Sequence, residues 1–228
     1  MIKEKTPMVI RRRFLLLMPG LVIVAAMTCG CVRLPELTQT GQETTYYTLE
    51  YEPASMTGEQ VTCSLAVDSF TAAPLFSTRK IIYRQKPYQT GEYRYHQWHV
   101  TPAEAIAHLL ARDLRQSGLF AAVFDPASGL SASFSLSGHL ETFLEDNTRK
   151  PWQAVLGIEI QLIDETQPDV DRSILMQKLY TAVEPCAREN PRATAEAMSR
   201  ALERLSRVIV QDVYDVIKAR QSAYVDKR

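Results

Sequence analysis

The sequence lacks the short motifs that many enzyme families carry. No P-loop, dinucleotide-binding G-x-G-x-x-G, G-x-S-x-G elbow or H-E-x-x-H pattern occurs in its 228 residues. Its four histidines include His96 and His99, three residues apart in an expected strand, where they would point to opposite faces rather than form a ligand pair. We therefore assign no catalytic residue, no metal site and no cofactor, and we interpret the acidic residues Glu141 and Glu145 as solvated charges at a strand edge.

A basic run is also missing from the body of the chain. The whole sequence has 26 basic and 26 acidic side chains, but five of the basic residues lie within the first 31 positions, with one acidic residue. The remainder has 21 basic and 25 acidic groups, a net charge of −4. Such a body offers no electrostatic surface for nucleic acid.

No apolar run is long enough to span a bilayer comfortably. The longest, residues 14–27, has 14 residues, whereas a spanning helix needs about 20. It follows Arg11-Arg12-Arg13 and ends near Gly30-Cys31, as in a bacterial lipoprotein signal. A transmembrane anchor is the alternative, and Cys29 is a second candidate for modification. We predict lipid attachment at Cys31, with residues 1–30 as signal peptide and 31–45 as anchor and polar tether.

Cysteine is scarce in the body, which contains only Cys63 and Cys186. In the alternating segment 61–67, Cys63 lies on the apolar face and is expected in the core. An oxidising periplasm permits a Cys63–Cys186 disulfide. The spacing alone decides nothing about its geometry, so free thiols remain the alternative.

The body, residues 46–220, shows the pattern of one α+β domain, followed by a tail at 221–228. Two short strands precede a hairpin around residues 85–91, and a helix begins at Thr101-Pro102, where Glu104 completes a capping box. Segments 132–144, 152–162 and 174–183 are expected to form an antiparallel meander, and Asn190-Pro191 opens a helix to about residue 219. We predict a two-layer sandwich, with a mostly antiparallel sheet and two helices on one face.

Aromatic side chains gather on the expected hairpin. The candidate partner-binding residues are Tyr83, Arg84, Tyr93, Tyr95 and Trp98. Tyrosine, tryptophan and arginine are enriched at interface hot spots. The alternative interpretation is ordinary packing of a sheet under a helix.

The ordered motifs of residues 46–124 resemble the ABC-type transport auxiliary lipoproteins, the PqiC-like family of Gram-negative bacteria. The residues that carry the resemblance are Tyr46-Tyr47-Thr48-Leu49, Phe70-x-Ala72-Ala73-Pro74-x-Phe76, Ile82-Tyr83-Arg84, Tyr95-His96-x-Trp98, Pro102 and Ser117-Gly118-Leu119-Phe120. Phe76 stands where tyrosine is expected in the family. Beyond Phe124 only the order of strands and the final helix agree.

The resemblance implies a fold similar to the amino-terminal domain of TolB and an accessory role without catalysis. It implies docking to ABC transporter or MCE-domain components that move lipids or hydrophobic solutes through the envelope. Val32, rather than aspartate, after Cys31 implies the outer membrane, facing the periplasm. A homo-oligomer is compatible with the sequence. A free-standing periplasmic lipid carrier, or a hydrolase, is the alternative function.

Overall fold

The computed structural model describes residues 43–225 apart from 54 and 127, which form one compact unit. The expected signal peptide, Cys31 and most of the tether lie outside the described residues. The elements in chain order are β1 (Thr45–Tyr47), β2 (Val61–Val67), β3 (Thr71–Ala72), η1 (Pro74–Phe76), β4 (Lys80–Lys86), β5 (Gln89–Trp98), α2 (Pro102–Gln116), β6 (Phe120–Phe124), β7 (Phe134–Asp146), β8 (Gln153–Asp164), α3 (Val170–Ser173), β9 (Ile174–Pro185) and α4 (Pro191–Val225).

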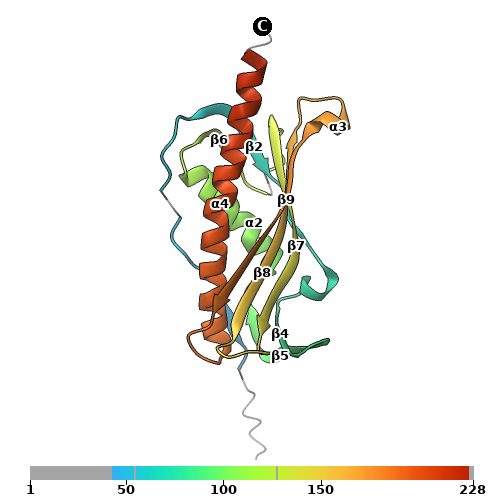
Figure 1. Cartoon of the computed structure of the whole chain (residues 1–228), viewed down its shortest axis with the longest axis vertical. Helices are drawn as coiled ribbons and strands as arrows, with labels where there is room; N and C mark the ends of the chain where they lie inside the picture. Colours follow the sequence, from blue (N-terminus) through green and yellow to red (C-terminus); the bar gives the residue numbers. More distant parts are fainter. Residues whose placement is uncertain (1–42, 54, 127, 226–228) are drawn as a thin grey trace, which may run out of the picture. The chain divides into compact units, whose positions relative to one another are not determined.

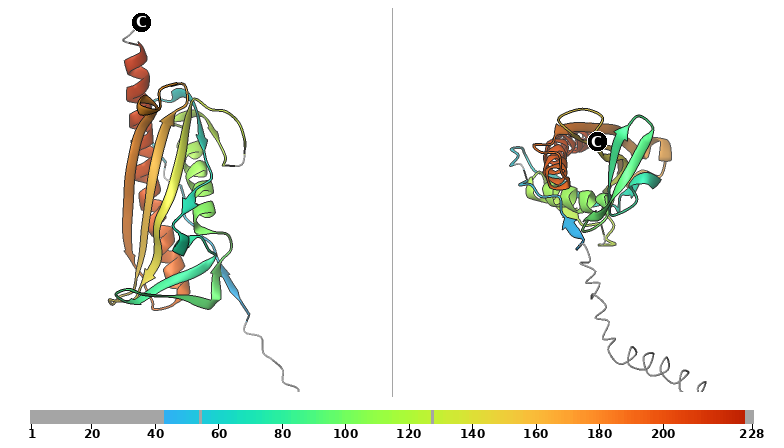
Figure 2. Two further views of the ribbon diagram at one scale, coloured as in Figure 1. Left: turned by 90° about the vertical axis from the view of Figure 1, so that its right-hand side faces the viewer. Right: turned by 90° about the horizontal axis from the view of Figure 1, so that it is seen from below.

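The described strands form one mixed, curled sheet (Figures 1 and 2). The antiparallel meander β7–β8–β9 and the hairpin β4–β5 are confirmed. However, β7 also runs parallel to β2, β3 and β4, while β1 is parallel to β5 and β6 to β2. The sheet is therefore mixed rather than one continuous meander, because the chain crosses over between β2 and β7.

The two long helices lie together on the concave side of the sheet (Figure 2). Helix α4 packs against β8 and β9, and α2 packs against β6, β7 and α4. The inward side chains of β8, including Leu156, Ile158 and Ile160, are fully buried beneath them. The α+β class is thus confirmed, with burial of this shared face as the main stabilising contribution.

Helix α2 begins where the sequence predicts, but without the expected cap. Thr101 occupies the N-cap position with an extended backbone, and Pro102 follows at the first helical position. The Thr101 side chain makes no capping hydrogen bond. At the other end, Gly118 adopts a φ of 70°, a left-handed conformation that glycine accepts without steric cost and that ends the helix.

Helix α4 is longer than expected, reaching Val225. Asn190 caps it, because its side-chain oxygen accepts a hydrogen bond from the Ala193 N–H at 2.9 Å. At 1.5 Å per residue its 35 residues span about 52 Å. The predicted apolar stripe faces the core: Met198, Leu202, Leu205, Ile209 and Val213 are all buried.

Candidate functional site

The hairpin β4–β5 carries the residues predicted to bind a partner, at the end of the molecule opposite the carboxyl end of α4 (Figure 1). Its turn is tight, with Tyr88 at a φ of 65° and fully exposed. The pairing of the two strands is irregular beyond the turn. Ile82 pairs with Glu92, whereas Lys80, two residues before Ile82, pairs with Gln97, five residues after Glu92. Strict alternation therefore fails here, and the five predicted residues have different environments.

Trp98 is a core residue, which corrects its assignment to a binding surface. Its side chain is 3% exposed, and its ring meets Phe143 edge-on with centroids 5.2 Å apart. Among the described residues its indole Nε1 has no hydrogen-bond acceptor. Trp98 is thus unavailable for direct contact with a protein partner on the outside of the hairpin.

Tyr83 and Tyr93 are half-buried and pack against each other, with ring centroids 4.9 Å apart. Tyr83 also covers Gly91 on the paired strand, where an added Cβ would lie 2.5 Å from its ring. The Tyr93 hydroxyl donates to Glu145 Oε1 at 2.7 Å. Burial and this hydrogen bond raise the Tyr93 pKa, so the phenol stays protonated. Both tyrosines hold the hairpin in place.

Arg84 forms an ion pair with Asp146, with Nη2 and Oδ2 3.0 Å apart. Burial alone would raise the Asp146 pKa, but hydrogen bonds from Thr148 and the nearby Arg84 outweigh it and lower that pKa. Arg84 is only partly exposed, and its Nε is buried without a partner among the described residues. Its first role is therefore to join β4 to β7.

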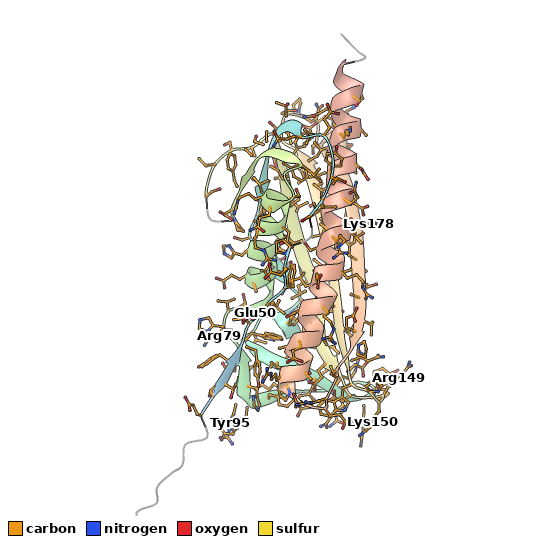
Figure 3. The ribbon with its side chains drawn as sticks, turned by 90° about the vertical axis from the view of Figure 1, so that its left-hand side faces the viewer. Glu50, Arg79, Tyr95, Arg149, Lys150 and Lys178 are labelled. Carbon is orange, nitrogen blue, oxygen red and sulfur yellow. The ribbon has the colours of Figure 1, made fainter. Side chains whose placement is uncertain are left out.

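Of the aromatic and arginine side chains on the hairpin, Tyr88 and Arg94 are exposed and Tyr95 is partly exposed, and we call these three residues the hairpin surface. The Arg94 guanidinium lies 5.4 Å from the centre of the Tyr95 ring, within the range of a cation–π interaction. Tyr95 lies at the same end of the molecule as Arg149 and Lys150 (Figure 3). An open groove of about 600 Å³ adjoins this region, lined in part by Tyr83, Arg94, Lys150 and Trp152.

Three buried carboxylates, Asp113, Glu145 and Asp164, connect α4 to the rest of the domain, and little in the amino-acid pattern indicates them. Glu145, expected at a solvated edge, is completely buried and accepts hydrogen bonds from Tyr93, Asn147 and Thr194. Asp113 accepts hydrogen bonds from Tyr51 and Ser206. Asp164 accepts hydrogen bonds from Thr166 and Arg220. Only Asp113 was recognisable, because it lies on the apolar stripe of α2. These networks stabilise the packing of α4.

Cys63 and Cys186 are free, buried thiols, so the disulfide that the sequence permitted is not formed. Cys186 Sγ lies 3.8 Å from Thr194 Oγ1, whereas the carbonyl of Thr62 accepts from Gln221 at 3.0 Å. Thr194 and Gln221 are separated by about 40 Å along α4. A disulfide needs Cα atoms about 4.4–6.8 Å apart. The fold therefore keeps the two cysteines apart.

An apolar pocket of about 250 Å³ lies between the segment around β1 and the start of α2. The end of β5 closes it, and Trp98 forms part of its lining. The full lining comprises Tyr47, Thr48, Leu49, Trp98, His99, Val100, Pro102, Glu104, Ala105, His108 and Leu109. No pattern in the sequence pointed to this pocket, because its walls come from three separate segments.

In the part of the chain that the structure describes, no three His, Cys, Asp or Glu side chains are grouped to hold a metal ion. His96 instead shares a hydrogen bond of 3.0 Å with the Tyr47 hydroxyl. Of the helices within residues 43–225, none has the length and apolar character needed to cross a bilayer.

Comparison with known proteins identifies the family. Residues 47–210 match the family described as "ABC-type transport auxiliary lipoprotein component". The chain belongs to this family. The match extends well beyond the motifs of residues 46–124 and includes the β7–β9 meander and most of α4. Membership supports an accessory role in transport and an envelope location on a membrane in Gram-negative bacteria.

Solved structures show the same fold at low sequence identity. Protein XCC0632 from Xanthomonas campestris, of family DUF330, aligns with a TM-score of 0.68 and 19% identity, covering 79% of this chain and 99% of its own. The protein CT253 from Chlamydia trachomatis aligns with a TM-score of 0.50 and 13% identity, covering 70% and 99%. No curated protein matches the chain significantly. These structural likenesses support the fold of this auxiliary lipoprotein and carry no residue roles.

Proposed function

We propose that this auxiliary lipoprotein is a non-catalytic component of an ABC or MCE-type transport system that moves lipids or hydrophobic solutes through the envelope. The observation that carries the proposal is the family match over residues 47–210, which takes in nearly the whole described domain. The protein acts by docking to a transporter component from the periplasmic side of the outer membrane. Its fold offers the partner a rigid domain held together by buried hydrogen-bond networks.

The proposed docking site is the hairpin surface of Tyr88, Arg94 and Tyr95, in place of the set that included Trp98. Tyr88 is fully exposed, and the Arg94 guanidinium stacks on the partly exposed Tyr95 ring. A rigid hairpin presenting aromatic and arginine side chains loses little conformational entropy on binding. The adjoining groove lets a partner side chain enter between the hairpin and Lys150.

The proposed anchor is an acyl group on Cys31, with residues 32–45 as a tether that reaches at most about 45–50 Å. Two or more acyl chains hold a protein stably on a membrane. Metabolic labelling with a fatty acid should mark the wild-type protein and a Cys29→Ala variant. The label should disappear in Cys31→Ala. Full labelling of Cys31→Ala would contradict the assignment.

Docking is tested by affinity purification of the full-length protein from detergent-solubilised envelopes, with mass spectrometry of what is retained. We expect an ABC transporter or MCE-domain subunit with the wild type and at least tenfold less with the double variant Arg94→Ala, Tyr95→Ala. A matched double variant, Arg207→Ala, Gln211→Ala, changes exposed residues of α4 far from the hairpin. Equal recovery with both double variants would move the docking site elsewhere, and absence of any transport subunit would contradict the function.

A free-standing lipid carrier is the competing function, and the apolar pocket is the feature that favours it. A pocket of 250 Å³ accommodates about eight groups the size of a water molecule, at about 30 Å³ each. The two acyl chains of a phospholipid have roughly thirty such groups. The pocket therefore fits part of one chain, which favours the accessory role over enclosure of a whole lipid. Mass spectrometry of extracted ligands distinguishes the two.

A further inference from the structure

The apolar pocket beside α2 has a chemistry that the family assignment does not explain. Its apolar walls include Leu49, Val100, Pro102, Ala105 and Leu109. These side chains come from the segment after β1, the residues after β5 and the first two turns of α2. Such a lining, in a space larger than the cavity of about 150 Å³ that holds benzene, favours an apolar ligand over water.

One polar group in the wall lacks a partner. Trp98 lines the pocket and is 3% exposed, and its indole Nε1 has no acceptor among the described residues. A buried donor without an acceptor costs about 1–3 kcal/mol. An acceptor on a bound ligand would relieve this cost if the ring turned its nitrogen toward the pocket.

Polar groups in and beside the lining favour a negative head group. His99 and His108 lie in the lining, and Arg79 Nη1 donates to the carbonyl of His99 at 3.5 Å. Arg79 lies on the same side of the molecule as Glu50 (Figure 3). The amino end of α2 also faces this region, and the Thr101 side chain does not cap it. Its dipole therefore favours an anion. Glu104, in the first turn, is the one carboxylate in the lining and opposes this attraction.

We propose that this pocket binds one alkyl chain of an anionic amphiphile. The chain lies against Leu49, Ala105 and Leu109, and the carboxylate or phosphate head lies at the mouth near Arg79, His99 and His108. The volume limits the buried part to roughly eight carbon atoms, so a longer chain would project from the mouth. This inference deepens the proposed function by naming a ligand class, but it does not depend on the docking surface at the hairpin.

Photoaffinity labelling of the full-length, anchored protein in phosphatidylcholine nanodiscs tests this site. Three decyl probes with a terminal diazirine would be used, bearing a carboxylate, a phosphate or a trimethylammonium head. Trypsin releases the peptide Tyr95–Arg112, which contains most of the lining. We expect saturable labelling of this peptide by the anionic probes and at least tenfold less by the cationic probe. The relative labelling by carboxylate and phosphate then distinguishes a fatty acid from a phosphorylated head group.

The variant Ala105→Phe fills the pocket and should remove the labelling. The variant Ala121→Phe, at an exposed position of β6, should leave it unchanged. Glu104→Gln removes the opposing carboxylate and should increase labelling by both anionic probes. Thermal unfolding shows whether each variant is folded. If Ala105→Phe is not folded, Leu109→Phe is used to fill the pocket instead.

Labelling that is spread over the surface, equal for all three head groups, or unaffected by a folded pocket-filling variant would overturn the proposal. The transporter purification described above is a separate readout. If it succeeds while the pocket remains unlabelled, the amphiphile site alone is wrong. If the pocket is labelled but no transport subunit is recovered, the docking function is wrong and the ligand site stands.

Discussion

The Tyr93 hydroxyl donates a hydrogen bond of 2.7 Å to Glu145, a contact that joins β5 to β7 across the intervening strand β4. Glu145 in turn accepts from Thr194 at the start of α4. A residue predicted to bind a partner is therefore the link between the hairpin and the buried centre of the domain. The hairpin therefore contains both packing residues, such as Tyr93, and accessible residues, namely the exposed Tyr88 and Arg94 and the partly exposed Tyr95.

Replacing Tyr93 by phenylalanine removes this donor and leaves the ring in place. Among the side chains that the structure describes, the fully buried Glu145 then keeps the hydrogen bonds from Asn147 and Thr194. We expect the free energy of unfolding, measured in urea, to fall by about 1–3 kcal/mol. Tyr95→Phe should change it by less than about 0.5 kcal/mol. Equal effects of the two variants would show that the Tyr93–Glu145 contact does not stabilise the domain.

Both α2 and α4 are preceded by a residue type that commonly caps helices, but replacing the two residues should affect stability differently. Asn190→Ala should cost about 0.5–2 kcal/mol because its side chain caps Ala193. Thr101→Ala should cost less than about 0.5 kcal/mol because its side chain makes no capping bond. Chemical denaturation of both variants checks this order. A larger loss in Thr101→Ala would restore the capping box expected from the sequence.

Asp164 should make stability depend on acid pH. Burial raises its pKa, but hydrogen bonds from Thr166 and Arg220 outweigh burial and hold the pKa below the ordinary value of 3.8. The unfolded chain therefore takes up the proton first, so this stabilisation is present above pH 3.8 and is lost as the pH falls through the lower folded-state value.

The unfolding free energy of the wild type and of Asp164→Asn should be measured from pH 7 to pH 3. The variant should be less stable at pH 7 and should lose less on acidification, since it has no carboxylate to protonate at this position. The same dependence on pH in both proteins would contradict the role of Asp164. The pKa values of Asp146 and Asp212 are also lowered, but both residues are present in both proteins, so their contributions to the pH dependence cancel in the comparison.

The buried thiols should resist modification in the folded protein. Burial raises the pKa of Cys63 to about 11 and also raises that of Cys186, so little reactive thiolate is present at neutral pH. Iodoacetamide should label both residues in urea and neither in the native state, as followed by peptide mass spectrometry. Recovery of a disulfide-linked Cys63–Cys186 peptide from non-reduced native protein would contradict their separation in the fold.

Local patterns in the sequence predicted local structure well. The alternation of residues 61–67 placed Cys63 and Leu65 in the core, and the apolar spacing along α4 identified its buried face. The crossovers that make β2, β4 and β7 parallel neighbours depend on contacts between distant segments. The positions of Glu145 and Trp98 were predicted wrongly for the same reason. Glu145 is buried by Thr194 of α4, and Trp98 packs against Phe143 of β7, so both environments come from distant segments.

Site-specific photocrosslinking in living cells tests the central claim most directly. A photoreactive amino acid would replace Tyr95 on the hairpin surface or Leu130, which is exposed in the loop before β7. We predict that the Tyr95 position crosslinks to an ABC transporter or MCE-domain subunit and that the Leu130 position does not. Crosslinks to such a subunit from Leu130 alone, or from neither position in folded and lipid-anchored protein, would contradict docking through the hairpin.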